Sequence, residues 1–188
     1  MTSIEGKTVA ILATNGFEQS ELFVPKQRLE EAGATVHIIS PETGEIKAWD
    51  EDDWGDTIAV DRPLGDAKVA HYDALVLPGG QINPDLLRVN DDAVTFVRDF
   101  FNSKKPLAAI CHAPWLLIEA EVVKGRSLTS YHSIATDVKN AGGLWTDEAV
   151  VVHEALITSR NPGDLDAFCD KIIEEIKEGR HPDRKKAA

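Results

Sequence analysis

The sequence predicts an α/β fold in which helices cover both faces of a mostly parallel sheet. Short β-rich apolar runs recur along the chain, at 7–13, 35–40, 73–80 and 106–111. Between these runs, apolar residues recur with the spacing of amphipathic helices. Strands that alternate with helices form parallel sheets, because each helix returns the chain to the edge where the next strand begins.

The first part of the chain predicts a strand at 7–13, a helix, and a second strand at 35–40. Between 41 and 63 the short pieces "IKAW" and "TIAVD" are separated by the acidic, turn-rich "DEDDWGD". This pattern predicts a small antiparallel excursion with a surface loop. Trp49 and Trp54 lie in this excursion, and we expect both to pack against the domain.

After the strand at 73–80, "NPDLLRVNDDAVTFVRDFFNS" predicts one or two helices. Then follow "PLAAIC" as a strand, "HAPWLLIEAEVV" as a helix, "SLTS" as a strand and "SIATDVKNAG" as a helix. "VVVHEALITSR" predicts paired strands, and a closing amphipathic helix places Cys169 on its apolar side, in the core. The basic end "RKK", which begins at Arg184, is expected to be a frayed, solvated tail.

The composition limits the class of protein. A chain of 188 residues, 43% of them hydrophobic, is expected to form one soluble domain over 1–188. We find no secretion signal and no apolar run long enough to span a membrane, so we expect a cytoplasmic protein with no membrane partner. The formal charge of −12 repels phosphate backbones, which argues against nucleic acid as a partner.

Candidate site residues follow three of the predicted strands. Glu18 lies just past the first strand, Gly79 and Gly80 end another, and Cys111 ends a third. The carboxyl ends of parallel strands meet at one edge of a sheet. The sequence therefore predicts that these residues share a site.

Cys111 lies where a strand meets a helix, and backbone N–H groups there favour the thiolate over the thiol. The chain has only two cysteines, which do not make a disulfide framework. His112 could act as its general base or acid, although adjacent residues on a turn usually point apart. A buried cysteine is often only a small hydrophobic residue, and that alternative stays open for Cys111.

Gly79 and Gly80 suit an oxyanion hole built from backbone N–H groups, or form only a turn. Glu18 suits a buried, protonated carboxyl next to the sulfur, or is only an acid in the first turn of a helix. We expect no cofactor and no metal, because the histidines considered have no metal-ligand spacing with the cysteines or with one another. These are His37, His71, His132 and His153. Tyr131 and His132 either line the pocket or have surface and packing roles, and Trp115 is expected to pack in the core.

The motifs "NGFEQSEL", "DALVLPGG", "AICHAPWLL", "GRSLTS", "DVKNAGG" and "LITSRNPGDL" occur in this order. The chain resembles the ThiJ/PfpI superfamily from Lys7 to about Ile176, and specifically its PfpI-type intracellular protease branch. The resemblance implies a flavodoxin-like sandwich, as in class I glutamine amidotransferase-like domains. It also implies a nucleophile at Cys111, a histidine partner at His112 and a thiolate-contacting carboxyl at Glu18.

In PfpI-type proteins an acidic residue of a neighbouring subunit orients the histidine, and the matching position here is Asp85. The resemblance therefore implies a homodimer or a larger homo-oligomer with its site at a subunit interface. The chain departs from the family in two places, with Ala113 where glycine is usual and Asp85 where the archetypal protease has glutamate. Both changes favour small-molecule chemistry over peptidase activity.

We expect a cysteine-dependent enzyme of stress defence that acts on reactive carbonyls such as methylglyoxal, or on their protein adducts. This would be a glyoxalase or deglycase type of reaction with Cys111 as nucleophile. One alternative is a cysteine peptidase that uses the same residues on a peptide. Another is a non-enzymatic redox sensor or chaperone in which Cys111 is oxidised to sulfinic acid.

Overall fold

The computed structural model describes residues 3–185 and 187, and it confirms the mostly parallel α/β sheet. Seven strands form the central sheet in the order β11-β12-β8-β7-β1-β3-β6. All neighbours pair in parallel except β11 and β12, which are antiparallel, as expected for the paired strands. The strands are β1 (Thr8–Leu12), β3 (Thr35–Ser40), β6 (Arg62–Pro63), β7 (Ala74–Leu77), β8 (Leu107–Ile110), β11 (Val150–His153) and β12 (Leu156–Ser159).

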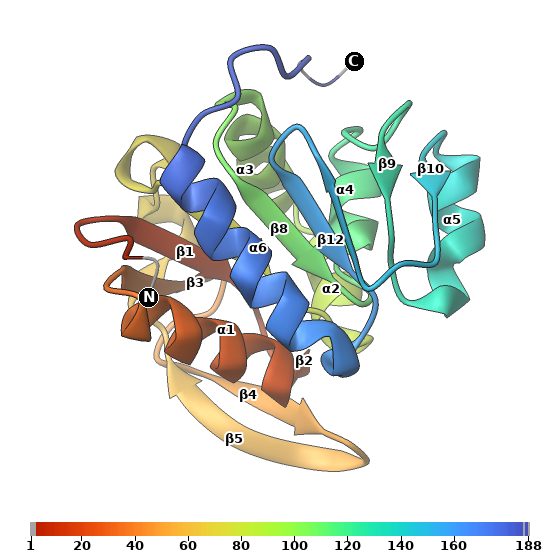
Figure 1. Cartoon of the computed structure of the whole chain (residues 1–188). Coiled ribbons are helices and arrows are strands. Elements are labelled where there is room, and N and C mark those ends of the chain that lie inside the picture. Colours follow the sequence, from red (N-terminus) through yellow and green to blue (C-terminus); the bar gives the residue numbers. More distant parts are fainter. Residues whose placement is uncertain (1–2, 186, 188) are drawn as a thin grey trace.

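Helices cover both faces of this sheet (Figure 1). On one face α1 (Gln19–Glu31) packs beside α6 (Leu165–Glu178). The other face carries α2 (Ile82–Arg88), α3 (Asp91–Asn102) and α4 (Pro114–Glu119), with α5 (Ala135–Asn140) beside α4. The 3-10 helices span Leu64–Asp66, Val69–His71, His132–Ile134 and Pro162–Asp164.

Alternation along the strands divides the apolar core between the two faces. In β1, Val9 and Ile11 pack in the cluster that contains the apolar residues of α1 and α6. Ala10 and Leu12, which point the other way, pack with those of α3 and α4. Successive side chains of a strand point to opposite faces, so a strand covered on both sides is apolar throughout.

The expected excursion forms the antiparallel pair β4 (Glu45–Asp50) and β5 (Asp53–Ala59). The short strand β2 (Phe17–Glu18) adds to β4 in parallel and completes a second, three-stranded sheet. Most of the acidic segment expected to be a loop is strand, because the turn needs only two residues and Glu51 takes a left-handed φ of 54°. Trp54 packs on Trp49, with ring centroids 5.6 Å apart, and stays 45% exposed. The expectation that both tryptophans pack against the domain is therefore wrong for Trp54.

The structure also defines the segment predicted as one or two helices and the "SLTS" segment. The stretch expected to form one or two helices forms two, because the side chain of Asn90 accepts a hydrogen bond from the N–H of Ala93 at 2.9 Å and begins α3 anew. The "SLTS" segment contributes only β9 (Ser127–Leu128), which pairs with β10 (Leu144–Trp145) outside the central sheet.

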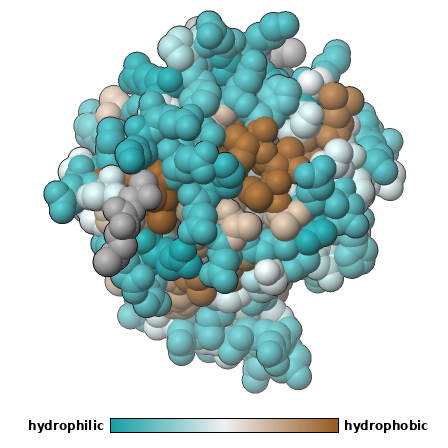
Figure 2. Space-filling model, viewed as in Figure 1, coloured by the Kyte–Doolittle hydropathy of each residue, from teal (hydrophilic) through white to brown (hydrophobic). Residues whose placement is uncertain are grey.

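The face of the molecule in Figure 2 is mostly hydrophilic, with apolar residues gathered near its centre. Acidic residues outnumber basic ones by 32 to 20, in keeping with a charged surface. None of the helices within the described residues is long and apolar enough to cross a membrane.

The C-terminal segment is anchored in the protein, so the expected solvated tail is wrong for Arg184. Its side chain is buried, and its guanidinium donates hydrogen bonds to the backbone carbonyls of Phe101, Lys105 and Glu154. The guanidinium also lies 4.3 Å from the ring centroid of Phe101. Lys186, the last residue of "RKK", lies outside the described residues. Backbone carbonyls from three separate places in the chain thus bind an arginine that the sequence places in a charged tail.

We expect Arg184→Ala to lower the free energy of unfolding by about 2–4 kcal/mol, because three buried carbonyls lose a charged donor and Phe101 loses its cation contact. Urea unfolding followed by circular dichroism measures this. Arg180→Ala is the matched control, because Arg180 is exposed in the same segment, and a change within about 0.5 kcal/mol is expected for it. Equal stability of the two variants would contradict the anchoring role of Arg184.

Candidate active site

The expected site residues gather at the carboxyl edge of the central sheet, around a pocket of about 430 Å³. The pocket is lined by residues that follow β1, β7, β8 and β9, so segments distant in sequence build it together. Its lining includes Glu18, Glu21, Gly80, Cys111, His112 and Tyr131. This is the location that the alternation of strands and helices predicts for a site.

Cys111 occupies a strained turn between β8 and α4. Its φ is +63°, a left-handed conformation that residues other than glycine rarely adopt. Two hydrogen bonds hold it there: the Cys111 N–H donates to the carbonyl of Ser159 at 3.1 Å, and the Tyr131 N–H donates to the carbonyl of Cys111 at 2.8 Å. Strain held in this way is typical of functional sites, since it costs stability and persists only when its surroundings enforce it.

Gly79 and Gly80 let a second strand end come close to Cys111. A Cβ on Gly79 would lie 2.5 Å from Oε2 of Glu21, 2.6 Å from Cβ of Cys111 and 2.7 Å from the carbonyl oxygen of Ile110. Gly80 lines the pocket with a φ of +81°. Burial raises the pKa of the Cys111 thiol, and the backbone N–H groups of Gly80 and His112 oppose that shift. Both glycines therefore permit a close approach, since a Cβ on Gly80 would lie 2.7 Å from the carbonyl oxygen of Gly16.

Asn83 joins the loops that follow β1 and β7. Its side chain is fully buried, and its Oδ1 accepts a hydrogen bond from the Thr14 N–H at 2.8 Å. Its Nδ2 donates to the carbonyl of Pro78 at 2.9 Å. These bonds keep the glycine turn in place beside the cysteine. The sequence analysis missed this role, because a polar residue in the first turn of a helix carries no sign of its burial.

His112 points toward Cys111, which decides the geometry that the sequence leaves open. Its Nδ1 lies 3.1 Å from Sγ of Cys111, and its Nε2 lies 3.1 Å from Oγ of Ser133. Tyr131 stacks on the imidazole, with ring centroids 4.7 Å apart. Burial, with a smaller contribution from His132, lowers the pKa of His112. The imidazole is therefore neutral at neutral pH and is able to accept a proton from the thiol.

Ser133 is a site residue that the sequence analysis missed. It lies 21 positions after His112, in the segment that follows β9. A hydroxyl both donates and accepts, so Ser133 is able to accept from Nε2–H when Nδ1 faces the thiol. Tyr131, whose role was left open, brings this segment over the imidazole. Trp115 is also more than a core residue, since its ring centroid lies 5.2 Å from that of His112.

The buried carboxyl next to the sulfur belongs to Glu21, and this corrects the expectation for Glu18. Glu21 has no exposed surface, and its Oε2 accepts a hydrogen bond from the Gly79 N–H at 2.9 Å. Glu18 is only half-buried at the pocket wall, where its carboxyl accepts from Ser20. The helical periodicity of α1 could have identified Glu21 as the buried carboxyl. Glu21 lies on the buried side of the helix with Leu22, Pro25 and Leu29, whereas Glu18 precedes the helix.

Glu21 and Cys111 depend on each other's protonation. Burial, and then the charge of Glu18, raises the pKa of Glu21 to about 8, although hydrogen bonds from Gly79 and Cys111 oppose the shift. Burial, and then the charge of Glu21, raises the pKa of the Cys111 thiol. At neutral pH Glu21 is therefore mostly protonated, which removes its repulsion of a thiolate and turns its O–H into a donor for the sulfur.

Asp85 and Cys169 lie away from this pocket. Asp85 is exposed on α2 and borders a separate surface hollow with Ile82, Leu86 and Trp115. It makes no hydrogen bond to His112 within the described chain, so its role as partner of the histidine stays a prediction about a neighbouring copy. Cys169 is fully buried on α6, as expected, and burial raises its pKa to about 12. Of the two thiols, only that of Cys111 borders the pocket.

We expect Gly79→Ala to distort the site, because the added methyl group would overlap Glu21, Cys111 and a backbone carbonyl at once. The alkylation rate of Cys111 by iodoacetamide should change at least about tenfold, and stability should fall by about 1–3 kcal/mol. Gly65→Ala is the control, since nothing lies within 4 Å of a Cβ at that glycine. Unchanged stability and alkylation in Gly79→Ala would contradict the proposed packing.

We expect Glu21→Gln to change the pH dependence of stability. Its pKa rises from 4.5 to about 8 on folding, so between these pH values the unfolded chain binds fewer protons and wild-type stability falls as pH rises. Glutamine does not titrate, so from pH 5 to pH 8 the variant should gain about 2–4 kcal/mol relative to the wild type. Urea unfolding at constant ionic strength measures the difference. A difference that is constant across pH would show that Glu21 ionises normally.

Comparison with known proteins agrees with this geometry. The model of the DJ-1/PfpI family matches residues 7–175. Protein/nucleic acid deglycase 2 of Escherichia coli (strain K12) is 44% identical and covers 86% of this chain and 93% of its own. Deglycase PfpI of Pyrococcus furiosus is 41% identical, covering 90% of this chain and 99% of its own. The crystal structure of Drosophila melanogaster DJ-1beta matches with a TM-score of 0.81 and 28% identity, over 92% of this chain and 94% of that chain. The protein therefore belongs to the DJ-1/PfpI family.

Proposed function

We propose that the protein is a cysteine-dependent enzyme that acts on small reactive carbonyls or on the adducts that they form with amino and thiol groups. The observation that carries this proposal is the 3.1 Å contact between Sγ of Cys111 and Nδ1 of His112 at the pocket. Such a pair activates a nucleophile in place, because the base already touches the proton it removes. The deglycase names of two relatives support the same class of reaction.

The first step transfers the Cys111 proton to Nδ1 of His112. The Nε2–H then donates to Oγ of Ser133, which holds the imidazolium in place. The sulfur attacks the carbonyl carbon, a C–S bond forms, and the electron pair of the C=O bond moves to the oxygen. Protonation of that oxygen by His112 gives a thiohemiacetal and restores the neutral imidazole.

Backbone donors support the charge that develops on the oxygen. The backbone N–H groups of Gly80 and His112 act to lower the pKa of the Cys111 thiol, so they favour negative charge at this position and would do the same for an oxygen on the attacked carbon. With methylglyoxal, rearrangement of the thiohemiacetal to a lactoyl thioester and hydrolysis by one water would give lactate and free Cys111. The protonated Glu21 favours the thiolate form of Cys111 without adding negative charge.

The size of the pocket supports a small substrate. About 430 Å³ accommodates a three-carbon carbonyl or a single modified side chain. Trp49, Glu18 and Glu51 line it as well, so its lining combines an aromatic surface with acidic groups. A peptidase would need room for an extended chain on both sides of the sulfur.

We also propose a homo-oligomer whose contact lies on α2. Three large apolar side chains are exposed on or next to this helix, Ile82 at 36%, Leu86 at 49% and Val89 at 79%. They surround Asp85, the residue expected to approach His112 from a neighbouring copy. An apolar patch of this kind, rimmed by charge, is typical of a protein interface.

We expect the wild-type protein to convert methylglyoxal to lactate. Cys111→Ser should be at least about 100-fold less active, because a serine hydroxyl is a far weaker nucleophile beside a neutral imidazole. Lactate formation measured enzymatically checks this. Cys169→Ala is the matched control, since it removes the other thiol, and it should keep the activity. Equal turnover by Cys111→Ser would overturn the proposal.

Further arms of the same experiment separate the alternatives. Absence of carbonyl turnover, with casein degraded by the wild type and not by Cys111→Ser, would favour the peptidase. Absence of both activities, with two oxygens added at Cys111 by dilute peroxide in an intact-mass measurement, would favour the redox sensor. Asp85→Asn should lower turnover while light scattering shows an unchanged mass, and full activity of that variant would refute its role at the interface.

A further inference from the structure

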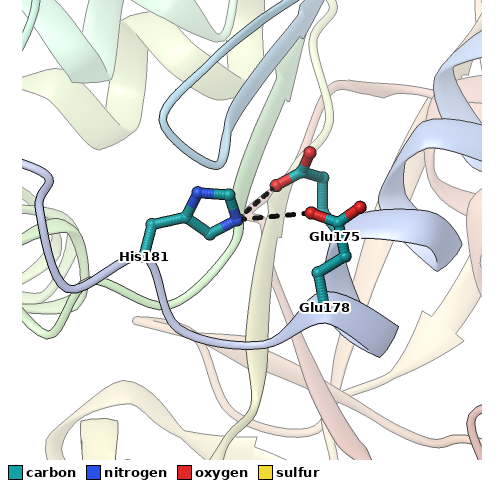
Figure 3. A group of neighbouring side chains, drawn as sticks. All are labelled: Glu175, Glu178 and His181. Carbon is teal, nitrogen blue, oxygen red and sulfur yellow. Dashed lines mark ion pairs between the residues drawn. The ribbon is translucent and has the colours of Figure 1, made fainter.

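A cluster of possible metal ligands lies at the edge of the sheet opposite to Cys111. Glu175 and Glu178 lie in the last turn of α6, and His181 follows in the C-terminal segment (Figure 3). The His181 N–H donates to the carbonyl of Lys104, just before β8, whereas Cys111 follows the end of β8. The cluster is therefore separate from the active site by the length of that strand.

Side-chain atoms of the three residues converge on one point. Nε2 of His181 lies 3.0 Å from Oε2 of Glu175 and 3.8 Å from Oε2 of Glu178. One ligand atom of each residue lies within 4.8 Å of the others. Figure 3 shows both carboxylates directed at the same ring nitrogen. A metal ion with bonds of about 2.0–2.2 Å needs its ligands roughly 3.0–3.5 Å apart, so only small side-chain movements would be required.

Glu175 supplies an independent observation that points to a ligand. It is only 6% exposed, and its Oε2 has no hydrogen-bond partner within the described residues. Nε2 of His181, at 3.0 Å, is an ion-pair partner of this oxygen when the imidazole is protonated, but the contact does not have the geometry of a hydrogen bond. A buried carboxylate oxygen without a hydrogen bond is unfavourable, because the water that it loses on folding is not replaced.

We propose that Glu175, Glu178 and His181 form a binding site for a divalent transition-metal ion of the zinc type. A divalent cation between Nε2 of His181 and Oε2 of Glu175 would bond to both atoms and supply the partner that Oε2 lacks. Two carboxylates and one neutral imidazole carry a charge of −2, which a divalent ion balances. An imidazole ligand favours zinc and its first-row neighbours over magnesium and calcium, which prefer oxygen ligands alone.

The surroundings leave space for the remaining ligands of such an ion. Glu178 and His181 border a surface pocket of about 240 Å³, through which an ion and its water molecules would enter. Bound there, the ion would join α6 to the segment that carries the buried Arg184. The expectation of no metal was based on four other histidines and the cysteines. It did not consider His181, whose partners lie three and six positions earlier along the chain.

The test is calorimetric titration of the chelator-treated protein with zinc chloride, in a Cys111→Ser background that removes zinc binding by the active-site thiol. We expect one ion per chain. His181→Ala and Glu178→Gln should each weaken binding at least tenfold. Glu174→Gln is the matched control, because Glu174 is exposed on the same helix and pairs with Lys171, and it should leave binding unchanged.

Thermal unfolding of the same proteins provides a second measurement. Zinc should raise the midpoint of the Cys111→Ser protein by roughly 3 °C or more, because the ion binds only the folded chain, and should not raise that of His181→Ala. Magnesium chloride at equal concentration should have no effect. Absence of zinc binding, binding unaffected by His181→Ala, or equal binding of magnesium would each overturn the proposal. Circular dichroism confirms that each variant is folded.

Discussion

The left-handed backbone at Cys111 is the constraint on which the site depends. With a φ of +63°, the turn after β8 places Cys111 at the boundary between the core and the pocket. This conformation is unfavourable for a cysteine, so neighbouring strands must enforce it. Hydrogen bonds to Ser159 and from Tyr131 hold its backbone, and Gly79 packs against its Cβ. The arrangement of β7, β8 and β12 in the sheet thus determines the position of Cys111.

The second requirement is a balance of charge around a buried sulfur. A thiolate at this position lacks most of its water, which raises the pKa of Cys111. Glu21 would raise it further if ionised, but its own burial keeps it largely protonated at neutral pH. His112, neutral for the same reason, is then the one group in direct contact with the sulfur that is ready to accept its proton. Burial is therefore the main influence on the protonation states of Glu21, His112 and Cys111.

A buried glutamate and a histidine lie at each edge of the sheet, but their surroundings differ. At the carboxyl edge, a buried glutamate and a histidine surround a thiol next to a pocket. At the amino edge, Glu175 and His181 lie 3.0 Å apart near the surface, and the chain continues to the buried Arg184. Arg184 donates hydrogen bonds to the carbonyls of Phe101 and Lys105. The C-terminal segment is in this way part of the folded structure.

The sequence by itself determined the order of strands and helices, because their apolar spacing is a local property that survives in almost any packing. It also placed Gly79, Gly80 and Cys111 at one edge, since parallel strands share direction. The tertiary structure alone decided that Glu21, and not Glu18, lies under the sulfur, and that Ser133 contacts His112. It likewise decided that Arg184 is buried. These contacts join residues tens of positions apart, and the burial that sets their charge exists only once several elements have packed together.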